Sequence, residues 1–289
     1  MKGLARSLVM LPAAMLGAVF GAEPARPASG DDKVKARLVT EHTALVPGRE
    51  ACIGITFTIA PKWHIYWHGL NDTGGGVEVA LTLPEGYEAG KVQWPAPKRY
   101  VSPGDILDHV YEDHVTLLVP VKVPADALPG STAKIAAELG WMVCSDICMI
   151  GGESVLLSVP VGAALAEGQL AKAGADAGLF AEARARLPRP IPKDLPPVRI
   201  DWTDGSARIH VPGAERLAFY PAAEFMGFES ILRDGQAKGD TLTLKLNPYT
   251  DGPVRLVGVL EATRPKPGPP SIFSVNTSPN GSPGNPGGG

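Results

Sequence analysis

The sequence predicts an all-β protein, on two observations. Apolar residues alternate with small or polar ones in short runs, which is the period-two pattern of a strand with one buried face. Turn sequences rich in proline and glycine separate these runs. The first runs lie at residues 51–59, 77–83, 115–123, 133–143 and 155–161. Their spacing favours an immunoglobulin-like β-sandwich over residues 32–161, although the Cys…Trp…Cys spacing of antibody domains is missing.

The sequence after the sandwich predicts a short helix and a second, smaller β-domain. Residues 162–197 form a linker in which 179–187 are strong helix formers and the prolines from 188 onward stop the helix. Five further strand-like runs lie at 198–202, 207–211, 217–220, 241–246 and 254–260. The resulting domain, 198–263, is near the lower size limit for independent folding, so we expect it to lean on the first. The tail, 264–289, is rich in Pro, Gly, Asn and Ser, and we expect it to be disordered.

The N-terminus has the pattern of an export signal. Lys2 and Arg6 precede an apolar run at 8–20, and small residues follow, so residues 1–22 are predicted to be a signal peptide. No later run approaches the roughly 18 apolar residues of a spanning helix, so we expect a soluble exported protein that does not itself span a membrane. With 27 basic and 30 acidic residues and no basic cluster, nothing indicates a nucleic-acid partner.

The spacing of two cysteines predicts a hairpin disulfide. Cys144 and Cys148 flank three residues, 145–147. On one straight strand their Cα atoms would be about 13 Å apart, whereas a disulfide needs about 4.4 to 6.8 Å, so the chain must turn between them. A three-residue hairpin loop would place them opposite each other, and the β-rich flanks disfavour a helical arrangement. We interpret the third cysteine, Cys52, as a small, partly buried thiol.

Such a small ring contributes little stability by loop closure, so disulfide exchange is the better reason for it. Cys144 and Cys148 are therefore the predicted catalytic residues, with no cofactor. An inert hairpin disulfide in a structural or interaction module is one alternative, and a pair of reduced core thiols is another that an oxidising compartment disfavours.

Copper binding is a further alternative, because soft sulfur ligands and imidazoles suit Cu(I). The candidate ligands are Met142, Cys144, Cys148, Met149, His64, His68, His109 and His114. Their spacing argues against a site, since His64 and His68 would lie about 13 Å apart along a strand.

Four ordered motifs resemble a known family. They are Lys-Trp-His-Ile-Tyr-Trp at 62–67, Val-Gln-Trp-Pro-Ala-Pro-Lys-Arg at 92–99, Tyr-Glu at 111–112, and Trp-Met-Val-Cys-Ser-Asp-Ile-Cys at 141–148. Together they resemble the N-terminal periplasmic domain of the thiol:disulfide interchange protein DsbD and the related ScsB proteins, over about residues 35–160. The following helix and small β-domain are similar to the ScsB arrangement.

The resemblance implies a periplasmic immunoglobulin-like domain. Its pair Cys144 and Cys148 would pass electrons between a membrane-embedded thiol electron donor and periplasmic thioredoxin-like proteins. The sequence contains neither the transmembrane carrier nor the terminal thioredoxin-like domain of full-length DsbD, so we expect a separate donor. The family also implies a mobile cap loop over the cysteines, for which residues 69–76 are the candidate.

Three further expectations concern the neighbourhood of the pair. Ile150 and Gly151 stand where relatives often carry Pro-Gly, and we expect them to loosen the strand that leaves the loop. The flexible Gly151-Gly152 pair and the family resemblance both favour Cys148 as the attacked sulfur. The aromatic residues Trp63, Tyr66, Trp67 and Trp94 are expected to pack in the sandwich, with shielding of the disulfide as the alternative.

Overall fold

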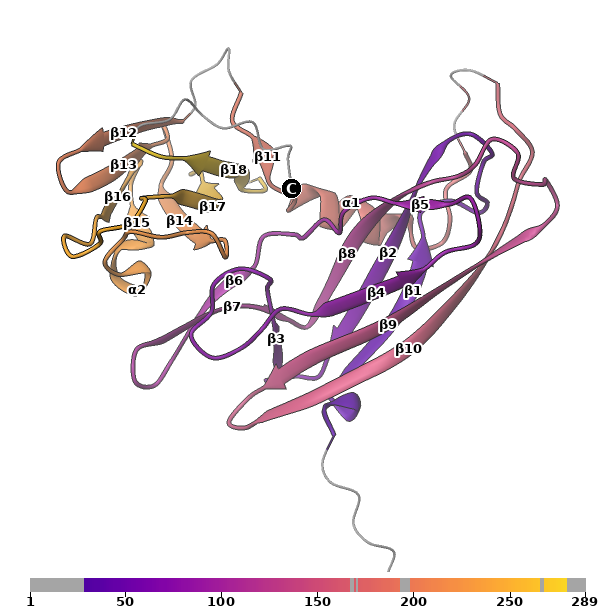
Figure 1. Cartoon of the computed structure of the whole chain (residues 1–289), viewed down its shortest axis with the longest axis horizontal. Coiled ribbons are helices and arrows are strands. Elements are labelled where there is room, and N and C mark those ends of the chain that lie inside the picture. The colour runs from indigo at the N-terminus through magenta and orange to yellow at the C-terminus, as the bar shows by residue number, and fades with distance from the viewer. Residues whose placement is uncertain (1–28, 167–168, 170, 193–197, 266–267, 280–289) are drawn as a thin grey trace, which may run out of the picture.

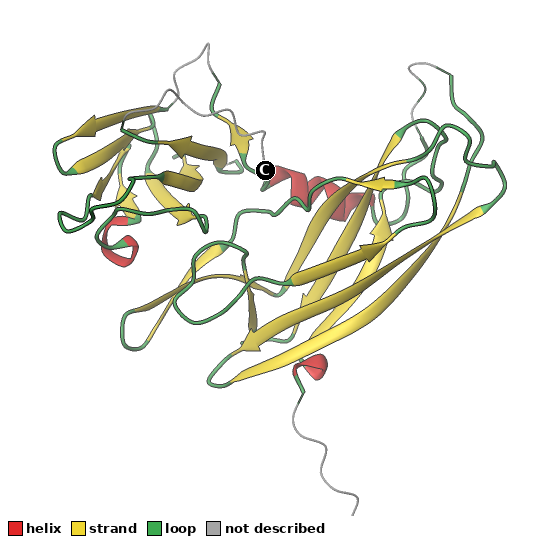
Figure 2. Ribbon diagram, in the orientation of Figure 1, coloured by secondary structure: helices red, strands yellow, loops and turns green. Residues whose placement is uncertain are grey.

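The computed structural model describes residues 29–166, 169, 171–192, 198–265 and 268–279, and it confirms the all-β class (Figure 1). Strands form both lobes of the molecule, and the helices among the described residues are short (Figure 2). The predicted signal peptide, residues 1–22, lies outside the described residues.

The first lobe is a sandwich of two sheets. A single 3-10 turn, η1 (Gly30–Asp32), leads into it. One sheet has the strand order β1-β2-β8-β5, formed by β1 (Val34–Thr40), β2 (Glu50–Ile59), β8 (His114–Lys122) and β5 (Glu88–Ala89). The other has the order β10-β9-β3-β7-β6, formed by β10 (Cys148–Pro160), β9 (Thr132–Cys144), β3 (His64–Tyr66), β7 (Ile106–Glu112) and β6 (Lys98–Ser102). A further strand, β4 (Glu78–Thr82), also pairs with β9.

The core of the sandwich lies between the two sheets. Ile53, Ile55 and Phe57 of β2 are all fully buried, as the period-two pattern of that run predicts. From the facing sheet, Trp141 meets Phe57 edge to face with ring centroids 5.9 Å apart. These large side chains fix which face of each strand points inward, and therefore fix the register of the strands that carry the cysteines.

The second lobe follows the helix α1 (Ala177–Ala185) and contains two small sheets. The larger has the order β11-β18-β17-β14-β15, formed by β11 (Arg189–Pro190), β18 (Ser271–Thr277), β17 (Leu256–Thr263), β14 (Arg216–Pro221) and β15 (Gln236–Lys238). The smaller has the order β12-β13-β16, formed by β12 (Arg199–Thr203), β13 (Ser206–His210) and β16 (Thr241–Lys245). A single-turn helix, α2 (Ile231–Asp234), lies between β14 and β15 along the chain.

The expectation of a disordered tail from residue 264 is wrong for residues 271–277. These residues form β18, which pairs along β17 from Ser271 to Thr277 and lies inside the larger sheet of the second lobe. Its apolar side chains Ile272, Phe273 and Val275 are buried. The apolar area that they bury offsets the entropy lost when the strand is ordered, which the composition of the tail alone did not indicate. Residues 280–289 lie outside the described part of the chain.

The two lobes are in direct contact. Tyr220, Val259 and Ile272 of the second lobe pack within the same apolar cluster as the core of the sandwich. The guanidinium of Arg99 donates to the carbonyl oxygens of Ile231 and Leu232 across the boundary, at 3.0 and 2.8 Å. The small domain therefore packs against the first, as its size predicts.

Candidate functional site: a hairpin disulfide beneath a tyrosine

The cysteine pair closes the tip of the longest hairpin in the sandwich. β9 ends at Cys144, β10 begins at Cys148, and the two residues are register partners with Cα atoms 4.2 Å apart. They form a disulfide, and the backbone N–H of Ser145 donates to the carbonyl of Ile147 at 3.0 Å across the loop. The predicted hairpin with a three-residue loop is therefore confirmed.

The strand leaving the loop is regular, contrary to the expectation from Ile150 and Gly151. Ile150 pairs with Met142 and Gly151 with Trp141, so both stay in the ladder. Gly151 is held tightly, because a Cβ atom at that position would collide with the indole nitrogen of Trp141. Flexibility of the glycine pair is therefore not what distinguishes Cys148 from Cys144.

Burial distinguishes the two sulfur-bearing residues instead. Cys144 is 2% exposed, whereas Cys148 is exposed. The difference follows from topology: β9 lies inside its sheet, with β10 on one side and β3 and β4 on the other, while β10 is the edge strand. Two apolar side chains near Cys148 are exposed as well, Ile147 at 61% and Ile150 at 70%.

A tyrosine hydroxyl lies against the buried sulfur. β3 pairs with β9 so that His64 is the register partner of Cys144, which brings Tyr66 to the disulfide. The Tyr66 hydroxyl donates to Cys144 Sγ at 3.0 Å and is 4.0 Å from Cys148 Sγ. Burial raises the pKa of Tyr66, so the hydroxyl keeps its proton and remains a donor at neutral pH. Of the four aromatic residues expected in the core, Tyr66 is thus the one that shields the disulfide.

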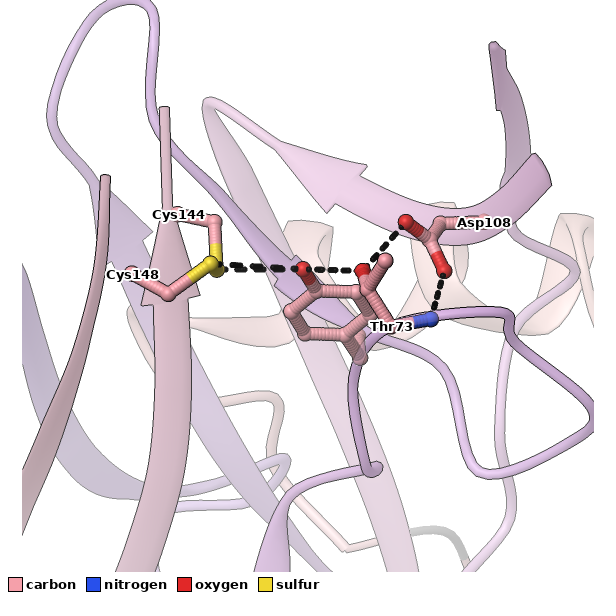
Figure 3. The surroundings of a disulfide bond; sticks show 5 residues. Thr73, Asp108, Cys144 and Cys148 are labelled. Carbon is pink, nitrogen blue, oxygen red and sulfur yellow. Dashed lines mark hydrogen bonds between the residues drawn. A yellow bond between two sulfur atoms is a disulfide. The ribbon is translucent and has the colours of Figure 1, made fainter. Parts of the chain in front are cut away.

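The hydroxyl of Tyr66 is connected to a buried carboxylate through Thr73 (Figure 3). Thr73 Oγ1 lies 3.1 Å from the Tyr66 oxygen and donates to Asp108 Oδ2 at 2.7 Å, while the Thr73 backbone N–H donates to Asp108 Oδ1 at 3.0 Å. A carboxylate only accepts, so the single hydroxyl proton of Thr73 goes to Asp108. Thr73 can then only accept from Tyr66, and the Tyr66 proton is shared between Thr73 and Cys144.

Thr73 belongs to the cap loop, residues 69–76, which connects β3 to β4. Gly74 of this loop packs directly on the ring of Tyr66, where a Cβ atom would collide with the ring carbons. Asn71 and Asp72 bind the backbone of β7: Asn71 Oδ1 accepts from the N–H of His109 at 2.7 Å, and Asp72 Oδ2 accepts from that of Leu107 at 2.6 Å. Because Cys148 stays exposed, the cap loop covers Tyr66 and through it Cys144, rather than the whole disulfide.

The other aromatic residues proposed for the site are packing residues. Trp67 is 1% exposed within the core cluster of the sandwich, and Trp63 and Trp94 pack against that cluster. This agrees with the expectation that they pack in the sandwich.

The candidate copper ligands are brought together only in part: His64 is the register partner of Cys144, and Met142 packs in the same small cluster as Cys144. His64 packs against the rings of Tyr66 and Tyr100, His68 lies against Trp94, and the exposed His114 contacts Glu182. Within the described residues no group of three or more His, Cys, Asp or Glu side chains could hold a metal ion. Both sulfurs of the pair are also bonded to each other, so neither is available as a thiolate ligand here.

Cys52 lies in the other sheet, on β2, and is a free, half-buried thiol that packs with Val39, Leu118 and Phe180. Burial raises the pKa of the Cys52 thiol to about 11, which leaves almost no thiolate at neutral pH. The interpretation of Cys52 as a small packing residue agrees with this environment.

The fold and the site together define an immunoglobulin-like domain that carries a half-exposed hairpin disulfide and is followed by a second β-domain. Residues 35–160 match the family model described as "Thiol:disulfide interchange protein DsbD, N-terminal". The match supports a DsbD N-terminal-like domain over these residues. The match and the observed disulfide support thiol:disulfide exchange as its chemistry.

One solved structure extends the likeness in fold to both lobes. The N-terminal periplasmic domain of ScsB from Proteus mirabilis superimposes with a TM-score of 0.54 at 15% identity, over 89% of this chain and 95% of that one. The N-terminal domain of DsbD from Neisseria meningitidis in its reduced form gives a TM-score of 0.29 at 11% identity, over 47% and 91% of the two chains. No curated protein sequence matched the chain. Every helix in the described residues falls short of the length and apolarity needed to cross a membrane.

Proposed function

We propose that this chain is a periplasmic thiol:disulfide exchange protein that passes electrons through Cys144 and Cys148 between a membrane-embedded thiol electron donor and periplasmic thioredoxin-like proteins. The observation that carries the proposal is the asymmetry of the disulfide. One sulfur-bearing residue, Cys148, is open at a sheet edge, and the other, Cys144, is buried against a hydroxyl donor. An inert structural disulfide needs neither feature.

The asymmetry supports a different role for each sulfur in the proposed exchange. A thiolate of the donor attacks Cys148 Sγ in line with the S–S bond, and a new bond forms between the donor sulfur and Cys148. The electron pair of the broken S–S bond goes to Cys144 Sγ, which leaves as a thiolate and receives the hydrogen bond of Tyr66 before it takes a proton from solvent. A second thiolate of the donor then attacks the donor's own sulfur in the mixed disulfide and releases Cys148. The donor leaves as a disulfide, and this chain has gained two electrons and two protons.

Transfer of the two electrons to the next protein uses the same two sulfurs in the reverse order of steps. The Cys148 thiolate attacks the partner's disulfide, and Cys144 then resolves the mixed disulfide by attacking Cys148 and releasing the reduced partner. The hairpin offers no helix N-terminus to lower a thiol pKa, so the reaction depends on partners that fit the site. The exposed apolar side chains of Ile147 and Ile150 beside Cys148 give such partners a surface to bind.

Trapping of a mixed disulfide tests this assignment. In the Cys144→Ser chain, Cys148 keeps its exposure but loses its resolving thiol, so it should hold an oxidised partner as a stable mixed disulfide on a non-reducing gel. The Cys148→Ser chain should trap far less, because its remaining thiol is buried under Tyr66. Both chains also carry Cys52→Ser so that only one thiol is present. Equal trapping by both chains, or stronger trapping through Cys144, contradicts the assignment of roles.

The reduction potential of the pair separates exchange from a structural disulfide. Structural disulfides of exported proteins typically lie below about −300 mV, and we expect a higher value for this pair. A potential below that limit, measured by equilibration with glutathione or dithiothreitol, would argue for an inert disulfide.

A further inference from the structure

The start of the cap loop lies against the second β-domain. The backbone N–H of Leu70 donates to the carbonyl of Pro221, the last residue of β14, at 2.9 Å. Gly69 approaches the same carbonyl so closely that a Cβ atom at residue 69 would collide with the oxygen. The loop that covers Tyr66 is therefore bound at its beginning by a residue from the other domain.

A buried histidine strengthens this junction. His109 of β7 is 1% exposed, and its Nδ1 lies 2.6 Å from the carbonyl oxygen of Leu70, to which it must donate. On its other side the imidazole meets the ring of Tyr220 edge to face, with ring centroids 5.7 Å apart at 88°. Tyr220, 5% exposed, thus supports the side chain that holds Leu70.

From this junction a continuous series of contacts leads to the buried sulfur. Asn71 and Asp72 bind β7, Thr73 binds Asp108, and Gly74 packs on the ring of Tyr66, whose hydroxyl donates to Cys144. The loop needs this support, because it contains three successive glycines, 74–76, and glycine loses more conformational entropy on ordering than any other residue. Contacts with the second domain help to offset that cost.

We infer that the second β-domain sets which sulfur of the pair is open to attack: Tyr220 and Pro221 are positioning residues that hold the cap loop and Tyr66 over Cys144. This inference rests on the proposed function, since selective attack matters only to an exchange site. Without the second domain at the junction, the loop and Tyr66 lift away from Cys144, and both sulfurs become accessible. The second lobe would then control access to Cys144, although none of its side chains takes part in the exchange chemistry.

Alkylation of single thiols tests this in the full chain. The Cys148→Ser chain reports on the exposure of Cys144, the Cys144→Ser chain reports on Cys148, and Cys52 in each serves as an internal reporter of global unfolding. Into both we introduce Tyr220→Ala, which removes the ring from His109, and Tyr220→Phe, which keeps the ring and removes only the hydroxyl. Tyr249→Ala is the matched control, since Tyr249 is a 90% exposed tyrosine of the same domain.

With iodoacetamide, Tyr220→Ala should raise the alkylation rate of Cys144 about tenfold, which corresponds to about 1.4 kcal/mol in the opening equilibrium. The rates at Cys148 and Cys52 should stay within about twofold of their values without the substitution. Tyr220→Phe and Tyr249→Ala should leave all three rates unchanged. Hydrogen exchange should also show the Leu70 amide protected in the original chain and exposed in Tyr220→Ala.

Two results with the variants would overturn the inference, and a third needs no variant. One is an unchanged Cys144 rate in Tyr220→Ala. The other is an alkylation rate of Cys52 that rises in parallel with that of Cys144, both in Tyr220→Ala and in the milder Tyr220→Leu. Such a rise would mean that Cys144 becomes exposed by unfolding of the protein and not by movement of the cap loop. Rapid exchange of the Leu70 amide in the original chain contradicts it without any substitution. None of these readouts uses a partner protein, so failure of the proposed exchange function would appear separately, in the trapping experiment.

Discussion

Replacing Tyr66 by phenylalanine isolates the hydroxyl that lies 3.0 Å from Cys144 Sγ. The ring that supports Gly74 is kept, so the cap loop should stay in place. What is lost is a hydrogen bond to the sulfur that becomes negatively charged when the S–S bond breaks. Hydrogen bonds to charged groups contribute about 1.5 to 3 kcal/mol. We take the lower value, about 1.5 kcal/mol, and assume that half to all of the negative charge on the sulfur has developed in the transition state. The activation free energy then rises by about 0.75 to 1.5 kcal/mol, and cleavage of the disulfide should slow by roughly 4- to 13-fold.

The assay follows reduction of the Cys144–Cys148 disulfide by dithiothreitol under pseudo-first-order conditions, over a pH range in which the reagent thiolate is corrected for. Tyr100→Phe is the control, because Tyr100 packs in the same small cluster as Tyr66 and Cys144 and loses the same hydroxyl group. Reduction of the Tyr66→Phe chain at the original rate, or an equal slowing in Tyr100→Phe, would refute the role given to the Tyr66 hydroxyl.

Three further predictions concern selectivity, pH and the C-terminal strand. The chain alone should reduce insulin poorly, since no helix N-terminus activates its thiols, and rapid insulin turbidity would contradict this. Burial lowers the pKa of His109 to about 4, below the unfolded value of about 6.5, so its stabilising effect is complete above pH 6.5 and is lost as the pH falls toward 4. At pH 5 the loss should be about 2 kcal/mol in the free energy of unfolding, and denaturant titrations should show His109→Gln with a flatter pH dependence. A chain truncated after residue 270 should lose the fold of the second lobe in limited proteolysis, whereas one truncated after residue 279 should keep it, because β18 supplies buried Ile272, Phe273 and Val275.

The sequence predicts the hairpin disulfide well, because the constraint is local. The distance between two cysteines four positions apart depends on a few backbone torsions. A straight strand is too long for a disulfide and the β-rich flanks disfavour a helix, so a turn is the conformation that fits. The same holds for a strand with one buried face, such as β9, where alternation is visible residue by residue. The pattern does not predict β7, since residues 107–111 are all buried, including Asp108 and His109, and alternation disappears when both faces are covered.

The strand β18 is not predicted from the sequence, for a different reason. Its apolar positions Ile272, Phe273 and Val275 form one short run within a region of proline, glycine, asparagine and serine. Composition averaged over the tail therefore outweighs the local pattern. What orders the strand is its pairing with β17, and nothing within residues 264–289 encodes that partner.

The chemistry around the disulfide is the least predictable part of the site. Tyr66, Thr73 and Asp108 meet because β3 pairs with β9 and the cap loop binds β7, which brings together residues up to 78 positions apart. Tyr66 lies within a recognised motif, but its hydroxyl and its aromatic ring predict different roles, and the sequence favours the packing role. Only the paired strands show that the hydroxyl points at a sulfur.

The ladder between β9 and β10 has a consequence for the redox cycle as a whole. Beyond the cysteines, backbone pairing continues without a break from Met149 opposite Val143 to Pro160 opposite Thr132. The two sulfurs are consequently held face to face by the hairpin itself, whether or not the covalent bond joins them. In the proposed exchange reaction, the bond between the sulfurs can therefore open and close without a rearrangement of strand pairing in the sandwich.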